Sequence, residues 1–174
     1  MNANAPAAER GPGLLALYDR GLPHVYGYLA ARVRDRALAE DLTAETFLAA
    51  VRAVKDDKVA DLTIPWLVTV ARNKLVDHWR RAAREQRTLQ LAEDPEAMFV
   101  DDDLDARFDR RYTREVLAAL TPHHRAALTL RYLDGLPVAE VAQHLDRTVH
   151  ATEALLVRAR RAFRARYDEG RSDD

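Results

Sequence analysis

Apolar positions along the chain recur at helical spacing from Leu14 onward. No stretch alternates apolar and polar residues as a half-buried strand does, so the pattern predicts an all-α fold. The first two helices predicted are residues 14–20 and 23–34. Pro23 opens the second of them, because its missing N–H is harmless in a first helical turn.

Two further helices complete a predicted N-terminal unit of four. Asp35 is placed to cap a helix over residues 36–54, and a loop then leads into a long helix over residues 66–90. The boundaries predicted for this domain are residues 14–90. A disordered segment rich in Ala, Pro, Gly and Asn is expected before it, at residues 1–13.

A second helical domain is predicted at residues 111–167, followed by a disordered tail at residues 168–174. Residues 91–110 between the two domains contain a Pro, many acids and weak periodicity, which is typical of a flexible linker. The predicted fold class is therefore two small helical domains, a four-helix N-terminal unit and a helix-turn-helix C-terminal unit, joined by an acidic linker.

The helix-turn-helix pattern lies in the second half of the C-terminal unit. A helix that starts after the capping hydroxyl of Thr121 and ends at Gly135 precedes it. A short helix to Leu145, the turn DRT and a longer helix over residues 149–166 follow. The second helix of such a pair can enter a DNA major groove. The two apolar faces predicted to pack together are Val138, Val141, Ala142 and Leu145 on one helix and Val149, Leu156, Ala159 and Phe163 on the other.

The first turns of the predicted recognition helix supply candidate DNA contacts. Thr148 is placed to cap the helix, and helix N-termini favour phosphate. A helical hairpin with a solvated basic face is the alternative reading. The candidates for base edges are Arg147, Thr148, His150 and Glu153, and those for backbone phosphate are Arg158, Arg160, Arg161 and Arg164.

The segment VARNKLVDHWRR carries polar and basic side chains along one side of an amphipathic helix. Asn and Asp offer hydrogen bonds to base edges, Arg offers phosphate pairing and stacking, and Asp77 can orient Arg80 or Arg81. Such a surface suits unstacked bases better than a closed duplex. A solvated polar face is the alternative, and Trp79 is interpreted as core. The predicted core stripe is Val68, Ala71, Leu75, Trp79 and Ala82, and the nucleic-acid candidates are Asn73, Asp77, Arg80, Arg81 and Arg84.

Charge is distributed unevenly, although the net charge is only -1. Residues 64–90 hold six Lys or Arg against two acids, residues 91–109 hold eight acids against one Arg, and residues 155–166 hold five Arg and no acid. Two basic blocks that flank an acidic one favour a nucleic-acid partner more than the net charge does.

Several classes of protein are disfavoured by composition. There is no Cys, which excludes disulfides and thiolate chemistry. No Gly-rich phosphate loop, metal-spaced His and Asp set or Ser-His-Asp arrangement stands out, so neither an enzyme nor a metal or other cofactor is expected. No apolar run approaches the roughly 18 residues that span a bilayer, and the N-terminus lacks a signal-peptide pattern. A cytoplasmic protein without membrane insertion is expected.

Three segments together resemble the extracytoplasmic-function (ECF) group of bacterial RNA polymerase sigma factors. They are AEDLTAETFLAA, PWLVTVARNKLVDHWRR and the stretch from LTPHHRAALTL to LLVRARRAF, in this order and spacing. The resemblance implies an alternative sigma factor. Its N-terminal domain would bind a coiled coil of the polymerase largest subunit and would also bind the minus-ten promoter element. Its C-terminal domain would read the minus-thirty-five element and dock on the β flap.

Further partners and roles follow from the same resemblance. The linker would thread toward the active-site channel, and an anti-sigma factor is an expected partner. Asn73, Asp77, Arg80 and Arg81 match the minus-ten surface of the family. A polymerase-binding stripe is expected on the third helix, where a solvated face is the alternative; its residues are Asp41, Glu45, Leu48 and Arg52.

The sequence also departs from the family pattern. Ala44 stands where Gln is frequent, DRT stands where the family has Gly-x-Ser, and Glu153 and Leu155 stand where Lys and Arg are usual. Glu153 can accept a hydrogen bond from a cytosine amino group, so a promoter sequence is not transferable from relatives. A helix-turn-helix regulator that binds duplex DNA without polymerase remains the alternative function.

Overall fold

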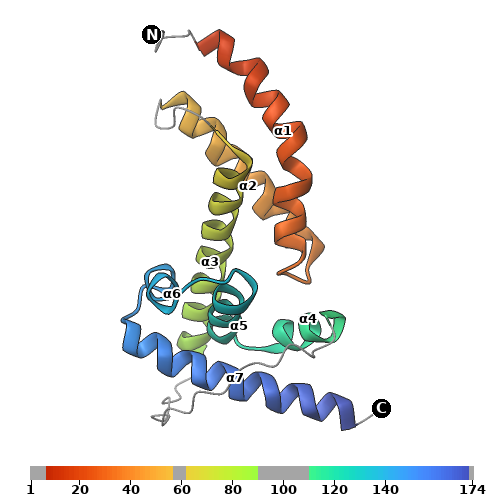
Figure 1. The fold of residues 1–174 in the computed structure, drawn as a ribbon, viewed down its shortest axis with the longest axis vertical. Coiled ribbons are helices and arrows are strands. Elements are labelled where there is room, and N and C mark those ends of the chain that lie inside the picture. Colours follow the sequence, from red (N-terminus) through yellow and green to blue (C-terminus); the bar gives the residue numbers. More distant parts are fainter. Residues whose placement is uncertain (1–6, 57–61, 90–109, 173–174) are drawn as a thin grey trace. The chain divides into compact units, whose positions relative to one another are not determined.

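In the computed structural model, residues 7–56, 62–89 and 110–172 are described, and within them every regular element is a helix (Figure 1). The predicted all-α class is thereby confirmed. None of the helices in these ranges is both long enough and apolar enough to cross a membrane. The elements are α1 (Ala7–Ala30), α2 (Arg36–Lys55), α3 (Ile64–Leu89), α4 (Arg110–Ala119), α5 (Pro122–Leu128), the π-helical turn η1 (Thr129–Leu133), α6 (Val138–Leu145) and α7 (Val149–Ser172).

The chain divides into two compact units, Met1–Leu75 and Val76–Asp174. The division falls inside α3, because the two halves of this long helix belong to different units. Nearly all of the predicted acidic linker lies outside the described residues. The domain limits expected from the sequence therefore stay predictions.

One continuous helix, α1, replaces the first two predicted helices, so the expected break before Pro23 is wrong. Over residues 7–56 and 62–89 there are three helices instead of four, and residues 7–13 are helical instead of disordered. A proline inside a helix removes one backbone hydrogen bond, and tertiary packing can offset that loss. Gly21 shows how closely α1 is packed: a Cβ atom there would lie 2.8 Å from Leu67 Cδ1 and 3.6 Å from Phe47 Cζ.

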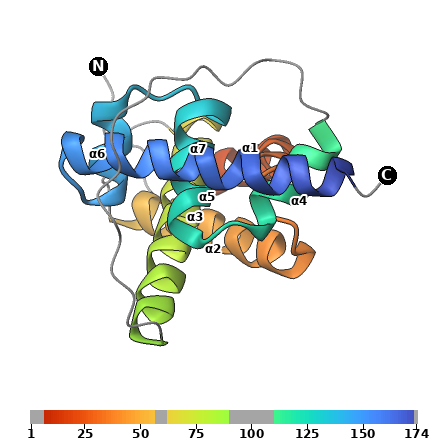
Figure 2. The same cartoon turned by 90° about the horizontal axis from the view of Figure 1, so that it is seen from below.

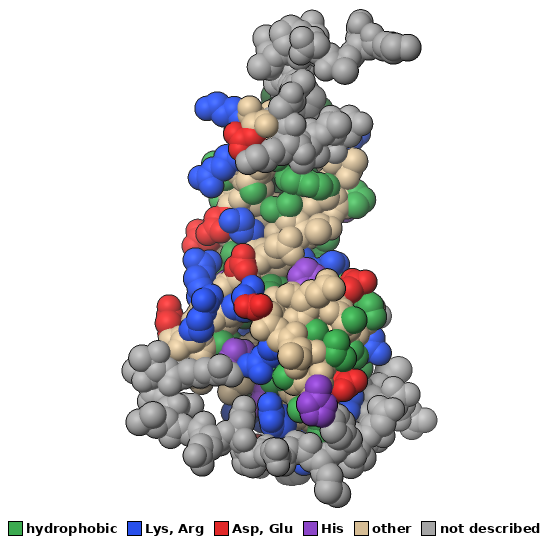
Figure 3. Space-filling view, turned by 90° about the vertical axis from the view of Figure 1, so that its left-hand side faces the viewer, with side chains coloured by type: hydrophobic (Ala, Val, Ile, Leu, Met, Phe, Trp, Pro, Cys, Tyr) green, Lys and Arg blue, Asp and Glu red, His purple; other side chains and the backbone are tan. Residues whose placement is uncertain are grey.

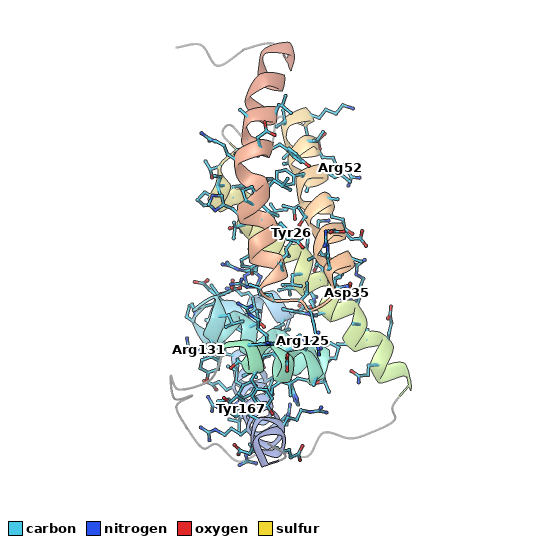
Figure 4. The ribbon with its side chains drawn as sticks, turned by 90° about the vertical axis from the view of Figure 1, so that its right-hand side faces the viewer. Tyr26, Asp35, Arg52, Arg125, Arg131 and Tyr167 are labelled. Atoms are coloured by element: carbon cyan, nitrogen blue, oxygen red, sulfur yellow. The ribbon has the colours of Figure 1, made fainter. Side chains whose placement is uncertain are left out.

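The first unit is closed by apolar side chains from α1, α2 and the first half of α3. Asp35 caps α2 as predicted, since its carboxylate accepts from the backbone N–H groups of Ala37 at 2.9 Å and Leu38 at 3.3 Å. Figure 4 shows Asp35 at the start of this helix and Arg52 toward its other end. The buried apolar side chains are Leu17, Val25, Leu29, Val33, Ala39, Leu42, Phe47, Ala50, Leu67, Ala71 and Leu75.

The second unit is organised on α7, which packs against α4, α5 and α6. α6 lies at the N-terminal part of α7 and α4 at its C-terminal part, with α5 between them (Figures 1 and 2). At the C-terminal part, the rings of Tyr112 and Tyr167 meet edge to face at a centroid distance of 4.8 Å. The core of this packing includes Val116, Leu117, Leu120, Ala127, Leu130, Val141, Ala142, Leu145, Leu155, Leu156, Ala159 and Phe163.

The helix before the helix-turn-helix ends at Gly135, as predicted. Gly135 has φ 69°, and the N–H of Leu136 donates to the carbonyl oxygen of Leu130 at 3.0 Å. The expected side-chain cap at the other end is wrong, because the Thr121 hydroxyl makes no capping hydrogen bond. Pro122 still occupies the first turn, where no N–H is needed.

Candidate nucleic-acid interface

The turn between α6 and α7 has the geometry of a tight helix-turn-helix. Asp146 ends α6 in the left-handed region, with φ 54° and ψ 51°. The N–H of Arg147 then donates to the carbonyl oxygen of Ala142 at 3.0 Å. Asp146 occupies the first position of DRT, where the family pattern has Gly. The left-handed conformation explains that preference, because Gly adopts it without the steric penalty of a side chain.

Thr148 caps α7, as the sequence predicts. Its hydroxyl oxygen accepts from the N–H of Ala151 at 3.1 Å, and its carbonyl oxygen accepts from the N–H of Thr152 at 3.0 Å. The Thr152 hydroxyl donates to the same carbonyl at 2.9 Å. These hydrogen bonds hold the first turn of α7 in place and so fix the direction in which its next side chains point.

The face that α7 presents outward differs from the predicted one at two positions. Val149, expected in the core, is 47% exposed, and the buried stripe begins instead at Thr152, which is fully buried. Leu155 is only 3% exposed, so it belongs to the core and is unavailable for DNA contact. The absence of Lys or Arg at Leu155 therefore removes no surface charge.

The candidates for duplex contact differ in how accessible they are. Thr148, His150 and Glu153 are exposed, whereas Arg147 and Arg158 are half-buried. Among the phosphate candidates, Arg161 is exposed, and Arg160 is half-buried and donates to the Tyr132 hydroxyl at 2.9 Å. His123, His124 and His144, which are not among these candidates, are half-buried.

A polar ridge runs along α3 and contains the second set of candidates. Asn73, Asp77, Arg81 and Arg84 are exposed, and Arg80 is half-buried. The Asp77 carboxylate lies 3.8 Å from Arg80 Nη1, which confirms the expected pairing at i, i+3. Arg81 instead donates from Nε to the Asp77 backbone carbonyl at 3.4 Å. Arg80 Nη2 also lies 3.1 Å from the Asp146 carboxylate, within the second unit.

The apolar side of α3 is rotated slightly from the predicted stripe. Trp79 is 2% exposed, which confirms its interpretation as core, and Ala71 and Leu75 are buried with it. Leu67 and Ala83 are buried in place of Val68 and Ala82, which are half-buried. The polar ridge therefore stays on the outer side of the helix.

The predicted stripe on α2 is only partly open. Asp41, Leu48 and Arg52 are exposed, and Leu48 retains 55% of its surface. Glu45 is half-buried, and its carboxylate lies 3.4 Å from Lys74 Nζ on α3. Sequence reasoning missed Val51, which is 44% exposed next to Leu48. Its apolar character on the outer side of an amphipathic helix was the available signal.

Positive and negative side chains are mixed on this surface. Figure 3 shows Lys and Arg side chains interspersed with Asp and Glu on the described part of one face. At the exposed start of α2, the hydrogen bond from Arg36 to Glu40 at 2.8 Å raises the pKa of Arg36. In the part of the chain that the structure describes, no three His, Asp or Glu side chains are grouped so as to hold a metal ion.

Two family models match the chain, one in its N-terminal part and one in its C-terminal part. Sigma-70 region 2 matches residues 17–85, and Sigma-70 region 4 matches residues 110–167. The RNA polymerase sigma factor CarQ of Myxococcus xanthus is 36% identical over 130 residues, which are 72% of this chain and 72% of CarQ. The chain belongs to the sigma-70 family, as an ECF-type sigma factor.

A second relative agrees with this membership, and a solved structure shares the fold. The ECF RNA polymerase sigma factor BldN of Streptomyces coelicolor is 34% identical over 84% of this chain. The match spans 57% of BldN, so this sigma factor is similar to little more than half of that relative. The sigma factor RpoE of Bartonella quintana, solved in complex with the anti-sigma factor NepR, shares the fold with a TM-score of 0.52. It is 19% identical, and the match covers 88% of this chain and 95% of RpoE.

Proposed function

We propose that this ECF-type sigma factor binds core RNA polymerase, recognises the minus-thirty-five and minus-ten elements of a promoter, and promotes transcription initiation. It acts in the cytoplasm as a non-enzymatic specificity subunit. The observation that carries the proposal is the presence, in one chain, of a capped helix-turn-helix with an exposed recognition face and a separate helix with an exposed polar ridge. Duplex and single-stranded DNA need surfaces of these two kinds.

The minus-thirty-five contact is assigned to the first two turns of α7. Exposed Thr148, His150 and Glu153 face the bases, and Arg147 and Arg158 flank them. Thr148 holds the helix start, so the N-terminal N–H groups of α7 favour a nearby phosphate.

The minus-ten contact is assigned to the outer face of α3. Asn73 and Asp77 can hydrogen-bond to the edges of unpaired bases, and the guanidinium groups of Arg80, Arg81 and Arg84 can stack on them or pair with phosphate. The ion pair with Asp77 limits the rotamers of Arg80 before any DNA is bound.

Polymerase contact is assigned to the stripe on α2. Leu48 is its apolar residue and is exposed, and Asp41 and Arg52 supply charge beside it. The coiled coil of the largest subunit is the proposed partner there, and the β flap is the proposed partner of the helix-turn-helix domain. An anti-sigma factor that covers these surfaces is a further proposed partner, supported by the complex of RpoE with NepR.

The proposal is tested by adding the purified full-length chain to core polymerase that lacks its own specificity subunit. Co-purification and promoter-dependent run-off transcription on genomic fragments are expected. Core polymerase alone is the control, and it should give no defined start sites. The competing function, a helix-turn-helix regulator, predicts tight binding of the isolated chain to a palindromic duplex and no effect on the start sites chosen by polymerase.

A further inference from the structure

Val149 and Glu153 form an outward-facing pair on the first two turns of α7. Val149 is the first residue of the helix and is 47% exposed, and Glu153 is exposed one turn later. Side chains four residues apart share a helix face, with Cβ atoms about 5 to 6 Å apart. An apolar and an anionic group therefore stand next to each other on the surface that the proposed function places in the major groove.

Both side chains lie outside the buried core. The buried stripe of α7 begins at Thr152, so Val149 lies outside the core. Within the described ranges, no ion pair or hydrogen bond engages the Glu153 carboxylate. The helix start depends on Thr148. Both side chains can therefore change while α7 keeps its position and its cap.

Base edges in the major groove offer a partner for each group. Thymine presents a C5-methyl group, which apolar side chains contact, and cytosine presents an N4 amino donor, which a carboxylate accepts. Phosphate repels a carboxylate, so Glu153 is unsuited to the DNA backbone and suited to the groove floor. Four residues of helix rise about 6 Å, which corresponds to one or two base-pair steps of about 3.4 Å.

We propose that Val149 and Glu153 set the base preference of the minus-thirty-five contact. Val149 packs on the methyl group of a thymine, and Glu153 accepts a hydrogen bond from the amino group of a cytosine one or two base pairs away. This inference rests on the proposed function, because it requires α7 to lie in the major groove of promoter DNA.

The test uses holoenzyme made from the full-length chain and core polymerase. The promoter library is randomised through the minus-thirty-five region, and each promoter carries a barcode downstream of the start site so that its transcript identifies it. Sequencing of run-off products should show a thymine and a cytosine preference for the unaltered chain. Val149→Ala should remove about fourfold of thymine preference, which is the value of burying the one C5-methyl group of thymine. Glu153→Gln should remove about fivefold or more of cytosine preference. Glu169→Gln, an exposed change on the same helix, is the matched control and should leave both preferences unchanged.

A second measurement alters the DNA as well as the protein. Replacing the preferred thymine by deoxyuridine removes only the methyl group, and it should lower run-off by the unaltered holoenzyme about fourfold. The same replacement should have no effect with Val149→Ala. Run-off that continues with unchanged preferences in both variants would overturn this inference and leave the proposed function standing. Failure of the unaltered chain to direct any promoter-dependent run-off would overturn the proposed function and this inference with it.

Discussion

Arg125 on α5 closes the end of α4 by donating from Nε to the carbonyl oxygen of Leu117 at 2.9 Å. Its Nη2 donates to the carbonyl oxygens of Ala118 and of Leu120, the latter at 3.2 Å. The last carbonyls of a helix lack partners within it, so this side chain satisfies two of those of α4 and also the carbonyl of Leu120, which follows the helix. Burial lowers the pKa of Arg125 from its ordinary value, but arginine remains charged in proteins.

Arg125→Ala is expected to destabilise the second unit by about 2 to 3 kcal/mol, because hydrogen bonds to a charged group are lost and carbonyl oxygens are left without donors. Urea denaturation followed by circular dichroism would measure the loss. Arg161→Ala, an exposed change on α7, is the control and should shift stability by no more than about 0.5 kcal/mol. Equal unfolding midpoints for the two variants would contradict the assigned role of Arg125.

Asp146 allows a test of the helix-turn-helix backbone, because it is the only non-glycine residue with positive φ in the described part of the chain. Asp146→Gly should be more stable than Asp146→Ala by about 1 kcal/mol, since Gly adopts the left-handed region without a Cβ penalty. Both variants lose the same ion pair with Arg80, so their difference isolates the backbone term. Thermal unfolding would compare them. An alanine variant as stable as the glycine variant would show that this turn is not strained.

The contact between Tyr112 and Gly170 predicts non-additive behaviour. The Tyr112 hydroxyl lies 3.3 Å from the carbonyl oxygens of Arg166 and Tyr167, and a Cβ atom at Gly170 would overlap that hydroxyl. Gly170→Ala should therefore destabilise the unaltered chain. In a Tyr112→Phe background the overlap with the hydroxyl is removed and a tight contact of 3.0 Å with ring atom Cζ is left. The better helix propensity of Ala, worth up to about 1 kcal/mol, should then reduce the loss. A double-mutant cycle with no coupling would refute this packing.

The polar ridge of α3 predicts a defect after assembly. Asn73→Ala and Arg80→Ala should leave holoenzyme formation intact but reduce open-complex formation about fivefold or more, because each removes a contact to unpaired bases. Permanganate reactivity of minus-ten thymines would report opening, and native gel shift would report assembly. Lys55→Ala, an exposed change on α2, serves as the control. Full opening by both ridge variants would place the minus-ten contact elsewhere.

Leu48 gives the cleanest test of polymerase binding. Leu48→Ala should weaken affinity for core polymerase about fivefold or more, because an apolar side chain that is 55% exposed in the free chain would be buried on binding. The paired change Asp41→Ala with Glu45→Ala should also weaken binding. That result is harder to interpret, because Glu45 pairs with Lys74. Fluorescence anisotropy of the labelled chain would measure affinity, with Leu15→Ala on α1 as the exposed apolar control. Unchanged affinity of Leu48→Ala would count against the α2 stripe.

Much of the fold follows from short-range patterns. The Asp35 and Thr148 caps, the end at Gly135 and the burial of Trp79 each depend on residues within a few positions of one another. Local signals also located most of the polar ridge on α3, because a repeat of three or four residues places side chains on one helix face. Where such signals conflict with packing, as at Pro23, the local rule fails.

Sequence alone determined the helical class, the helix-turn-helix and the family, since periodicity, caps and motif order are properties of neighbouring residues. Tertiary structure decided that α1 continues through Pro23, that Val149 faces outward while Leu155 is buried, and that Arg125 closes α4. The physical reason is that burial and the satisfaction of helix ends depend on segments distant in sequence. The spacing of residues within one helix cannot specify which of those segments lies against it.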